Sequence, residues 1–197
     1  MSRVTEIAPG LRRWTALHDE WREEVASLAV DTDDGLVLIG PIDPPRGVAR
    51  PDHILITVFW HGRSAGDVAG SRVWASKRAV RRLGNRGVTV TDTIEDGDAL
   101  PGGIRAFSTA RDSELVFWLP RQKAVVAGDV LLGAGAKPNA TDEPLRLCPE
   151  RWLGDASHAV LRRSLGPVLA LPVQRVLVSH GDPVLRSGKR ALAAVLA

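Results

Sequence analysis

Val125-Val126-Ala127-Gly128-Asp129-Val130 is the stretch of sequence that decides the fold, together with Val176-Leu177-Val178-Ser179-His180-Gly181-Asp182-Pro183. Each is a predicted strand rich in β-branched residues, and it ends at a polar side chain that can bind a metal ion or a proton. Rigid scaffolds commonly hold reactive side chains at the ends of strands. The sequence therefore predicts a functional site that contains Asp129 and His180.

Composition and length indicate an ordinary globular protein. The chain has 197 residues, of which 44% are hydrophobic and 25% are charged, so one domain spanning residues 1–197 can bury a sizeable core. The single cysteine, Cys148, excludes an internal disulfide and suits a reducing compartment. No apolar segment approaches the roughly 20 residues that span a bilayer. We expect a cytoplasmic protein without a membrane partner, and the oligomeric state stays open.

The positive charge does not by itself indicate a nucleic-acid partner. The net charge is +3 and the pI is about 9.6, and arginine far outnumbers lysine, which is typical of a codon bias. The basic residues Lys77, Arg78, Arg81, Arg82 and Arg86 fall along one side of a short predicted helix. No aromatic residues are interleaved with them, so we interpret them as a solvated helix face and expect no nucleic-acid partner.

Hydrophobic patterning predicts strands and helices in both halves of the chain. The first half is expected to hold a hairpin, two further strands and a basic helix, in the order 24–30, 36–39, 54–60, 72–75 and 76–83. The second half is expected to hold five strands, one helix and a terminal helix, in the order 88–91, 103–108, 114–119, 123–127, 157–165, 176–179 and from 188 onward. Hairpins followed by strand–helix alternation favour two mixed sheets packed face to face with helices outside.

Four motifs in this order resemble the metallo-β-lactamase superfamily. Leu38-Ile39-Gly40-Pro41 is similar to the family's Leu-Ile-Asp-Pro strand end, and Ile54-Leu55-Ile56-Thr57 to the strand that precedes its His-x-His-x-Asp-His motif. The stretch from Leu119 to Leu131 resembles the segment that carries the metal-bridging aspartate, and the segment from Ser179 to Pro183 resembles the one that carries the last histidine ligand. The resemblance covers nearly the whole chain. It implies a metallo-β-lactamase-type αββα sandwich of two mixed β-sheets with helices on the outer faces, and a relationship to zinc-dependent hydrolases.

The family's metal motif is largely replaced in this chain. In direct register, its four ligand positions hold Val58, Trp60, Gly62 and Arg63. His61 is displaced by one residue, which on an extended strand turns it to the opposite face unless a bulge re-aims it. The family's Pro-Gly-His segment corresponds to Thr109-Ala110-Arg111-Asp112. Only Asp129 and His180 match the usual ligands by position.

These replacements favour a site without a metal ion or other cofactor. A zinc hydrolase uses three protein ligands and an open position, whereas a guanidinium can neutralise a carboxylate directly. We therefore predict a polar cluster of Arg63, Asp129 and His180 that binds a small anionic molecule. An ion pair that only joins two sheet ends is favoured at least as much as a catalytic role for this cluster. The expected ligand-binding residues are Arg63, Trp60, Arg111 and Asp112. Whether the chain is an enzyme stays open.

Two catalytic alternatives also fit the sequence. One divalent ion of zinc, iron or manganese could be held by His61, Asp129 and His180, assisted by Asp112 or Asp67. Alternatively, Gly62-Arg63-Ser64-Ala65-Gly66 matches the Gly-x-Ser-x-Gly nucleophile motif. In that case Ser64 attacks an ester, His180 takes its proton and Asp129 orients the imidazole.

Overall fold

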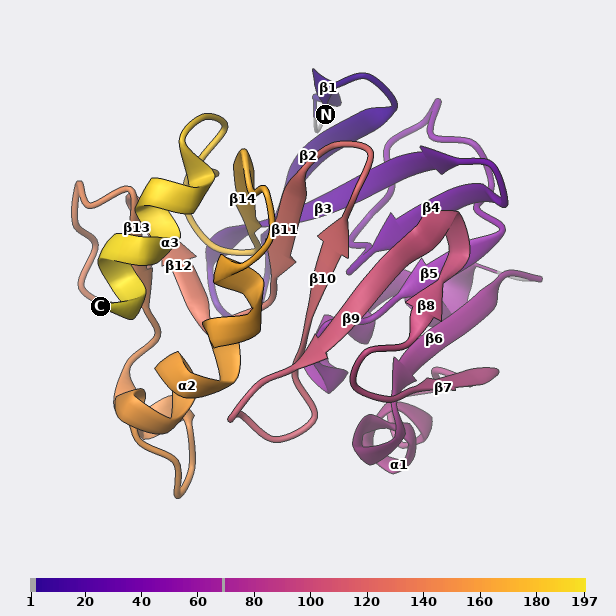
Figure 1. The fold of residues 1–197 in the computed structure, drawn as a ribbon. Helices are drawn as coiled ribbons and strands as arrows, with labels where there is room; N and C mark the ends of the chain where they lie inside the picture. Colours follow the sequence, from indigo (N-terminus) through magenta and orange to yellow (C-terminus); the bar gives the residue numbers. More distant parts are fainter. Residues whose placement is uncertain (1–2, 69) are drawn as a thin grey trace.

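Two β-sheets packed face to face form the centre of the computed structural model, which describes residues 3–68 and 70–197 (Figure 1). The first sheet has seven strands that neighbour one another in chain order. Its strands are β1 (Thr5–Ala8), β2 (Leu11–His18), β3 (Glu23–Thr32), β4 (Gly35–Ile39), β5 (His53–Leu55), β6 (Arg72–Ser76) and β7 (Asp92–Ile94). The pairing is antiparallel from β1 to β4 and parallel from β4 to β7, so the sheet is mixed.

The second sheet has five strands in the order β14-β11-β10-β9-β8. Its strands are β8 (Ala99–Leu100), β9 (Ile104–Ser108), β10 (Leu115–Leu119), β11 (Ala124–Ala127) and β14 (Arg175–Val178). Strands β11 and β14 run parallel side by side, so the segments that follow them leave the sheet at the same edge. A separate two-stranded ribbon consists of β12 (Leu131–Gly133) and β13 (Leu145–Leu147).

Alternating side chains divide the apolar core into three layers. Phe117 and Val126 of the second sheet face Val30 and Ile39 of the first sheet between the sheets. Neighbouring residues on the same strands point outward, such as Val125, which packs in the layer that contains residues of the C-terminal helices. A third layer covers the outer face of the first sheet.

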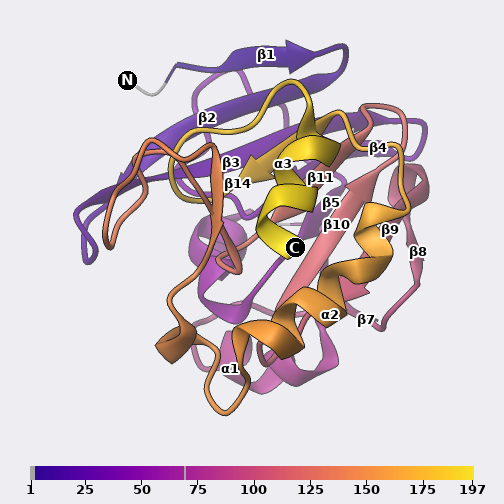
Figure 2. The same cartoon turned by 60° about the vertical axis from the view of Figure 1, so that its left-hand side comes forward.

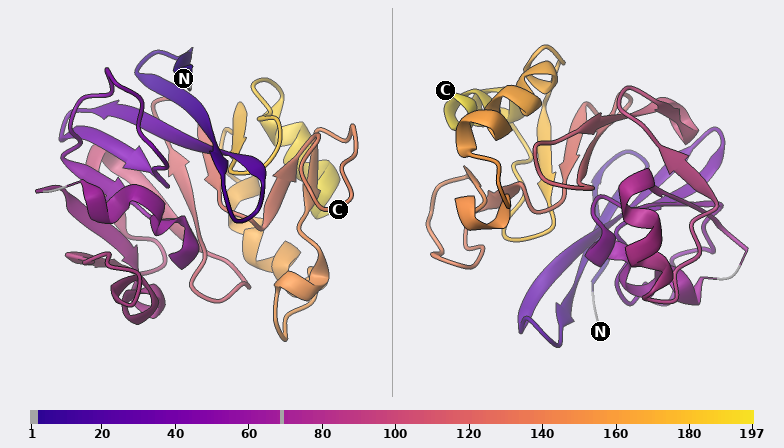
Figure 3. Two further views of the ribbon diagram at one scale, coloured as in Figure 1. Left: turned by 180° about the vertical axis from the view of Figure 1, so that it is seen from behind. Right: turned by 90° about the horizontal axis from the view of Figure 1, so that it is seen from below.

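Helices cover both outer faces, which confirms the predicted αββα sandwich. Helices α2 (His158–Leu169) and α3 (Gly188–Leu196) pack together over the second sheet (Figure 2). Seen from below, α1 (Val80–Gly84) lies on the other side of the sheets (Figure 3). Four short 3₁₀ segments complete the fold: η1 (Phe59–Asp67), η2 (Lys77–Ala79), η3 (Pro101–Gly103) and η4 (Glu150–Trp152). Among the described residues, no helix combines the length and apolar character that crossing a membrane requires.

Most predicted elements are confirmed, and two strand predictions are wrong. The strand predicted over 54–60 ends at Leu55, and the chain turns into η1 at Phe59. Gly62 lets Leu83 of the basic helix pack closely against this turn, because a Cβ there would lie 2.6 Å from the side chain of Leu83. The strand predicted over 88–91 has no ladder partner, and the pairing begins at Asp92 instead.

Gly133 is expected to tolerate no side chain, because a Cβ at this position would lie 2.0 Å from the backbone oxygen of Asp182. Its amide donates to the carbonyl of His180 at 3.0 Å, so the strain of overpacking falls on the segment that carries His180. We expect Gly133→Ala to lower the free energy of unfolding by about 3 kcal/mol, measured by urea denaturation. Gly166→Ala in α2, where nothing lies within 4 Å of the added Cβ, is the matched control and should be neutral or slightly stabilising. Equal stability of the two variants would contradict this account of Gly133.

Candidate functional site

Three buried side chains meet at the edge of the sandwich where β11 and β14 end. Nε2 of His61 lies 3.0 Å from Oδ1 of Asp129, and Nε2 of His180 lies 3.2 Å from the same oxygen. One ligand atom from each residue lies within 4.8 Å of the other two. His61 comes from η1, Asp129 follows β11, and His180 follows β14. The predicted proximity of Asp129 and His180 is therefore confirmed.

The atoms at the centre of this cluster lack hydrogen-bond partners. Nε2 of His61 and Oδ1 of Asp129 are both buried. Although they lie close together, neither atom forms a hydrogen bond of acceptable geometry. Two donors bound to one metal ion lie roughly 3.0–3.4 Å apart when each bond is roughly 2.1 Å long. Orphaned nitrogen and oxygen atoms at this spacing fit a divalent cation with histidine and carboxylate ligands.

The outward-facing nitrogens of both histidines lie beside polar side chains, and that of His61 forms a hydrogen bond there, whereas that of His180 does not. Nδ1 of His61 lies 2.7 Å from the hydroxyl oxygen of Thr57 and 3.4 Å from that of Ser179. Nδ1 of His180 lies 3.5 Å from a carboxylate oxygen of Glu23. Metal-binding histidines commonly have such a partner on the other ring nitrogen, because it fixes the tautomer and the ring orientation. The surroundings of the His61 ring therefore suit ligation through Nε2, and at His180 the carboxylate of Glu23 lies on the corresponding side of the ring.

The second oxygen of Asp129 faces a different set of groups. Nε1 of Trp60 donates to Oδ2 at 2.7 Å, and Nη1 of Arg111 lies 3.3 Å from it. The Arg111 guanidinium lies 4.4 Å from the centre of the Trp60 ring and 5.5 Å from that of Trp152. Cation–π contacts with both indoles hold the guanidinium in place.

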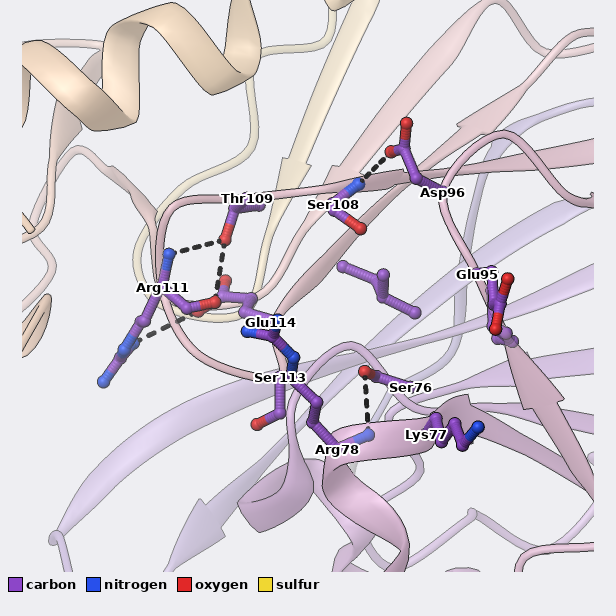
Figure 4. A pocket seen from close by; sticks show the side chains of 12 residues that line it. Ser76, Lys77, Arg78, Glu95, Asp96, Ser108, Thr109, Arg111, Ser113 and Glu114 are labelled. Atoms are coloured by element: carbon purple, nitrogen blue, oxygen red, sulfur yellow. Dashed lines mark hydrogen bonds and ion pairs between the residues drawn. The ribbon is translucent and has the colours of Figure 1, made fainter.

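Glu114 lies beneath the cluster and was not predicted from the sequence. Its Oε1 accepts hydrogen bonds from the amides of Asp129 at 2.6 Å and Val130 at 2.9 Å, and its Oε2 pairs with Nη1 of Arg111 at 3.2 Å. Figure 4 shows the Arg111–Glu114 pair at the wall of a neighbouring cavity of about 550 Å³. A Cβ at Gly128 would lie 2.7 Å from Oε1, so a glycine is needed for this approach. Glu114 therefore fixes the loop that presents Asp129.

Burial and charge shift the pKa values of the site. Burial, and then the nearby charge of Arg63, lower the pKa of His61 to about 3. Burial would also lower the pKa of His180, but its contacts with Asp129 and Glu23 outweigh this effect and raise it to about 9. Burial, and then the charge of Asp129, raise the pKa of Glu114 to about 7. Burial opposes the ionisation of Asp129, yet the two histidines hold its pKa well below the usual value.

A cavity of about 560 Å³ opens beside the cluster. This volume lies within the range of small-molecule sites. It is lined by Trp21, Glu23, Trp60, Arg111, Asp129, Lys137, Pro138, Arg151, Trp152 and His180. The pocket is therefore aromatic on its walls, basic at several positions and connected to two of the three clustered residues. The predicted ligand-binding residues Trp60 and Arg111 line it.

Arg63 does not form the predicted pair with Asp129. Its Nη1 donates to the carbonyl oxygens of Ala26 at 3.2 Å and Gly40 at 3.1 Å, and its backbone adopts a φ of 35°. The guanidinium that contacts Asp129 belongs to Arg111 instead. The reason is the early end of β5: the chain turns into η1, which is kinked at Arg63, and the side chain reaches Ala26 within β3 and Gly40 just after β4.

The same turn brings His61 to the cluster. An extended strand would have turned His61 and Trp60 to opposite sides, but consecutive residues of a 3₁₀ helix lie about 120° apart. Both side chains therefore reach Asp129, His61 at Oδ1 and Trp60 at Oδ2. The sequence allowed a bulge to redirect the His61 side chain toward the site. In the structure this 3₁₀ turn redirects it instead.

The remaining predicted residues lie outside the cluster. The Ser64 hydroxyl oxygen accepts from the amide of Asp43 at 3.0 Å, and both ring nitrogens of His180 face carboxylates, so the serine relay is not assembled. Asp112 pairs with Arg82 at 2.8 Å and Arg78 at 3.6 Å, away from the pocket. Asp67 is exposed. Burial raises the pKa of Cys148 to about 12, which agrees with an inert thiol.

Comparison with known proteins identifies the fold. No family model matches the chain, and neither does any curated protein sequence. Among solved structures, a metallo-β-lactamase from Pontibacter korlensis is 18% identical with a TM-score of 0.69, covering 100% of this chain and 99% of that one. A metallo-β-lactamase from Hirschia baltica is 14% identical with a TM-score of 0.70, covering 99% and 97%. The mono-zinc form of FIM-1 from Pseudomonas aeruginosa is 15% identical with a TM-score of 0.70, covering 99% and 94%. The chain has the metallo-β-lactamase fold.

Proposed function

We propose that this chain is a hydrolase that binds one divalent metal ion through His61, Asp129 and His180 and acts on a small anionic substrate. The observation that carries the proposal is the pair of orphaned buried atoms, Nε2 of His61 and Oδ1 of Asp129, since unsatisfied buried polar groups are costly. The proposal replaces the metal-free site expected from the sequence, whose Arg63–Asp129 contact does not form.

Each part of the site has a role in this proposal. An ion bound there supplies Lewis-acid chemistry for hydrolysis. Thr57 orients the ring of His61, the carboxylate of Glu23 faces Nδ1 of His180, and Glu114 fixes the backbone of Asp129. The indoles of Trp60 and Trp152 reduce the access of water to the polar groups beside them, which strengthens electrostatic interactions there.

Metal analysis tests the proposal. Protein purified without chelator should contain one equivalent of zinc, iron or manganese per chain, and Asp129→Asn should contain less than a tenth of that amount. The metal-loaded protein should hydrolyse members of a panel of chromogenic carboxylic esters, and a chelator should abolish that activity. Ser64→Ala should retain it, because Ser64 does not contact His180. Metal-free protein that takes up no ion on reconstitution would instead favour a binding pocket in which His180 and Arg111 neutralise Asp129.

A further inference from the structure

The two carboxylate oxygens of Asp129 serve two different kinds of partner. Oδ1 faces the two histidine nitrogens, where the proposed metal ion would bind. Oδ2 faces the indole of Trp60 and the guanidinium of Arg111. A carboxylate that could bridge two cations is therefore occupied on one side by a cationic side chain of the protein.

Four side chains contact the Arg111 guanidinium. Glu114 and Asp129 contact its Nη1 at 3.2 Å and 3.3 Å. The Trp60 and Trp152 rings lie 4.4 Å and 5.5 Å from its Cζ. Only 11% of its side chain is exposed. The position of this charge is therefore fixed before any ligand arrives, which reduces the entropic cost of binding to it.

Part of the Arg111 guanidinium remains available to a ligand. Among residues 3–68 and 70–197, no hydrogen bond uses its Nε or Nη2, and the residue lines the 560 Å³ pocket. A guanidinium presents its N–H groups as a planar fork that matches the oxygens of carboxylates and phosphates. The free N–H groups of Arg111, beside the proposed metal ion, therefore form a binding position for an oxyanion.

The charges around the pocket also favour an anion. Lys137 and Arg151 line it, and neither forms a salt bridge with any residue in the described part of the chain. The two acidic residues of the lining, Glu23 and Asp129, both face His180. Positive charge at the pocket therefore attracts an anionic ligand and raises its rate of encounter.

We propose that Arg111 is the second cation of this site, so that the chain holds one metal ion and binds the carboxylate or phosphate group of its ligand through the Arg111 guanidinium. This inference rests on the proposed function for the position of the metal ion. In this proposal the anion lies in the pocket, with the wall formed by Trp60 and Trp152 on one side and the ion-binding cluster on the other. Arg111 thus acts as a ligand-binding residue, and Glu114 acts through it as a positioning residue.

Calorimetric titration with benzoate and phenyl phosphate tests the inference, with benzyl alcohol as the uncharged comparison. In the metal-loaded protein, Arg111→Met should weaken binding of at least one anion roughly tenfold or more, because a charge-assisted hydrogen-bond partner is lost. Arg111→Lys should restore part of the affinity. Arg190→Gln, an exposed arginine on α3, is the control and should bind like the wild type. The response to each anion distinguishes a carboxylate ligand from a phosphate ligand.

Metal stoichiometry provides an independent measurement. The wild-type chain should bind one zinc ion even in excess zinc, and Arg111→Met should retain that ion with a similar affinity in a chelator competition. Because Arg111→Met leaves Glu114 without its partner, the double variant Arg111→Met/Glu114→Gln is measured in parallel. A second tightly bound ion in the wild type, or unchanged anion affinity in both variants, would overturn the inference.

The two proposals fail in different ways. If the wild type binds no metal ion, the proposed function is contradicted, whereas the anion titrations of metal-free wild type and Arg111→Met still decide the role of Arg111. If metal binds normally but benzoate and phenyl phosphate bind no better than benzyl alcohol, the metal site stands and the anion-binding role of Arg111 is contradicted.

Discussion

Glu114→Ala is expected to lower the free energy of unfolding by about 3–5 kcal/mol, the scale for breaking a buried charged pair. The carboxylate is fully buried, accepts two backbone amides next to Asp129 and pairs with Arg111. Alanine leaves both amides without their acceptor and leaves Arg111 with Asp129 as its only carboxylate partner among the described residues. Each of these losses carries a desolvation cost, because the groups involved are buried.

Urea denaturation followed by tryptophan fluorescence measures this loss. Glu114→Gln should cost less, about 1–2 kcal/mol, because its amide oxygen can still accept from the two backbone amides. Glu143→Ala, at an exposed loop position, is the control and should change stability by less than about 0.5 kcal/mol. If Glu114→Ala were as stable as Glu143→Ala, Glu114 would not be the support of the Asp129 loop.

The sandwich could be predicted from the sequence because its signals are local. Alternating and continuous apolar runs, such as the hairpin of β3 and β4, identify strands without any knowledge of their partners. The positions of Asp129 and His180 followed from the same signals, since both residues come directly after apolar strands that run parallel. The parallel pairing of β11 and β14 then brings the two side chains together.

The rest of the site depends on a change of backbone conformation that has little local signal. Ile54 to Trp60 is apolar except for Thr57, a pattern that predicts one strand, but the strand ends at Leu55 and a 3₁₀ turn begins at Phe59. Because of that change, His61 contacts Asp129, and Arg63, the expected partner of Asp129, points elsewhere. A turn signal was present in Gly62, whose missing side chain makes room for Leu83.

Arg111 and Glu114 show a second limit of sequence reasoning. A carboxylate directly before the apolar strand Leu115–Leu119 has the same local pattern as a solvated strand end. Only the three-dimensional arrangement shows that Glu114 is buried and that Asp129 and Val130 donate to it. Arg111 was expected near the site, but its choice as the partner of Asp129 depends on Glu114 and on the two indoles.

Zinc is expected to raise the melting temperature of chelator-treated wild-type protein by about 5–10 °C. A ligand that binds only the folded state at 100 times its dissociation constant stabilises by about 2.7 kcal/mol, and each kcal/mol shifts the melting temperature of a chain of this size by about 2–4 °C. His61→Asn should reduce the shift to less than about 2 °C, because only two ligands then remain. Since His61 lies outside the family's usual ligand register, this variant tests the contribution of the 3₁₀ turn directly.

His53→Asn is the matched control for this measurement. His53 lies on β5, shortly before the same turn, and its ring contacts the carbonyl of Asp34 and the indole of Trp74, so its replacement should preserve the zinc-induced shift. If His61→Asn and His53→Asn respond to zinc equally, the ion binds elsewhere, and Nε2 of His61 has a structural role beside Asp129. If only His61→Asn loses the response, the one-residue displacement of the histidine is compensated by the turn. A metallo-β-lactamase fold would then hold its ion through a ligand set that sequence register alone does not predict.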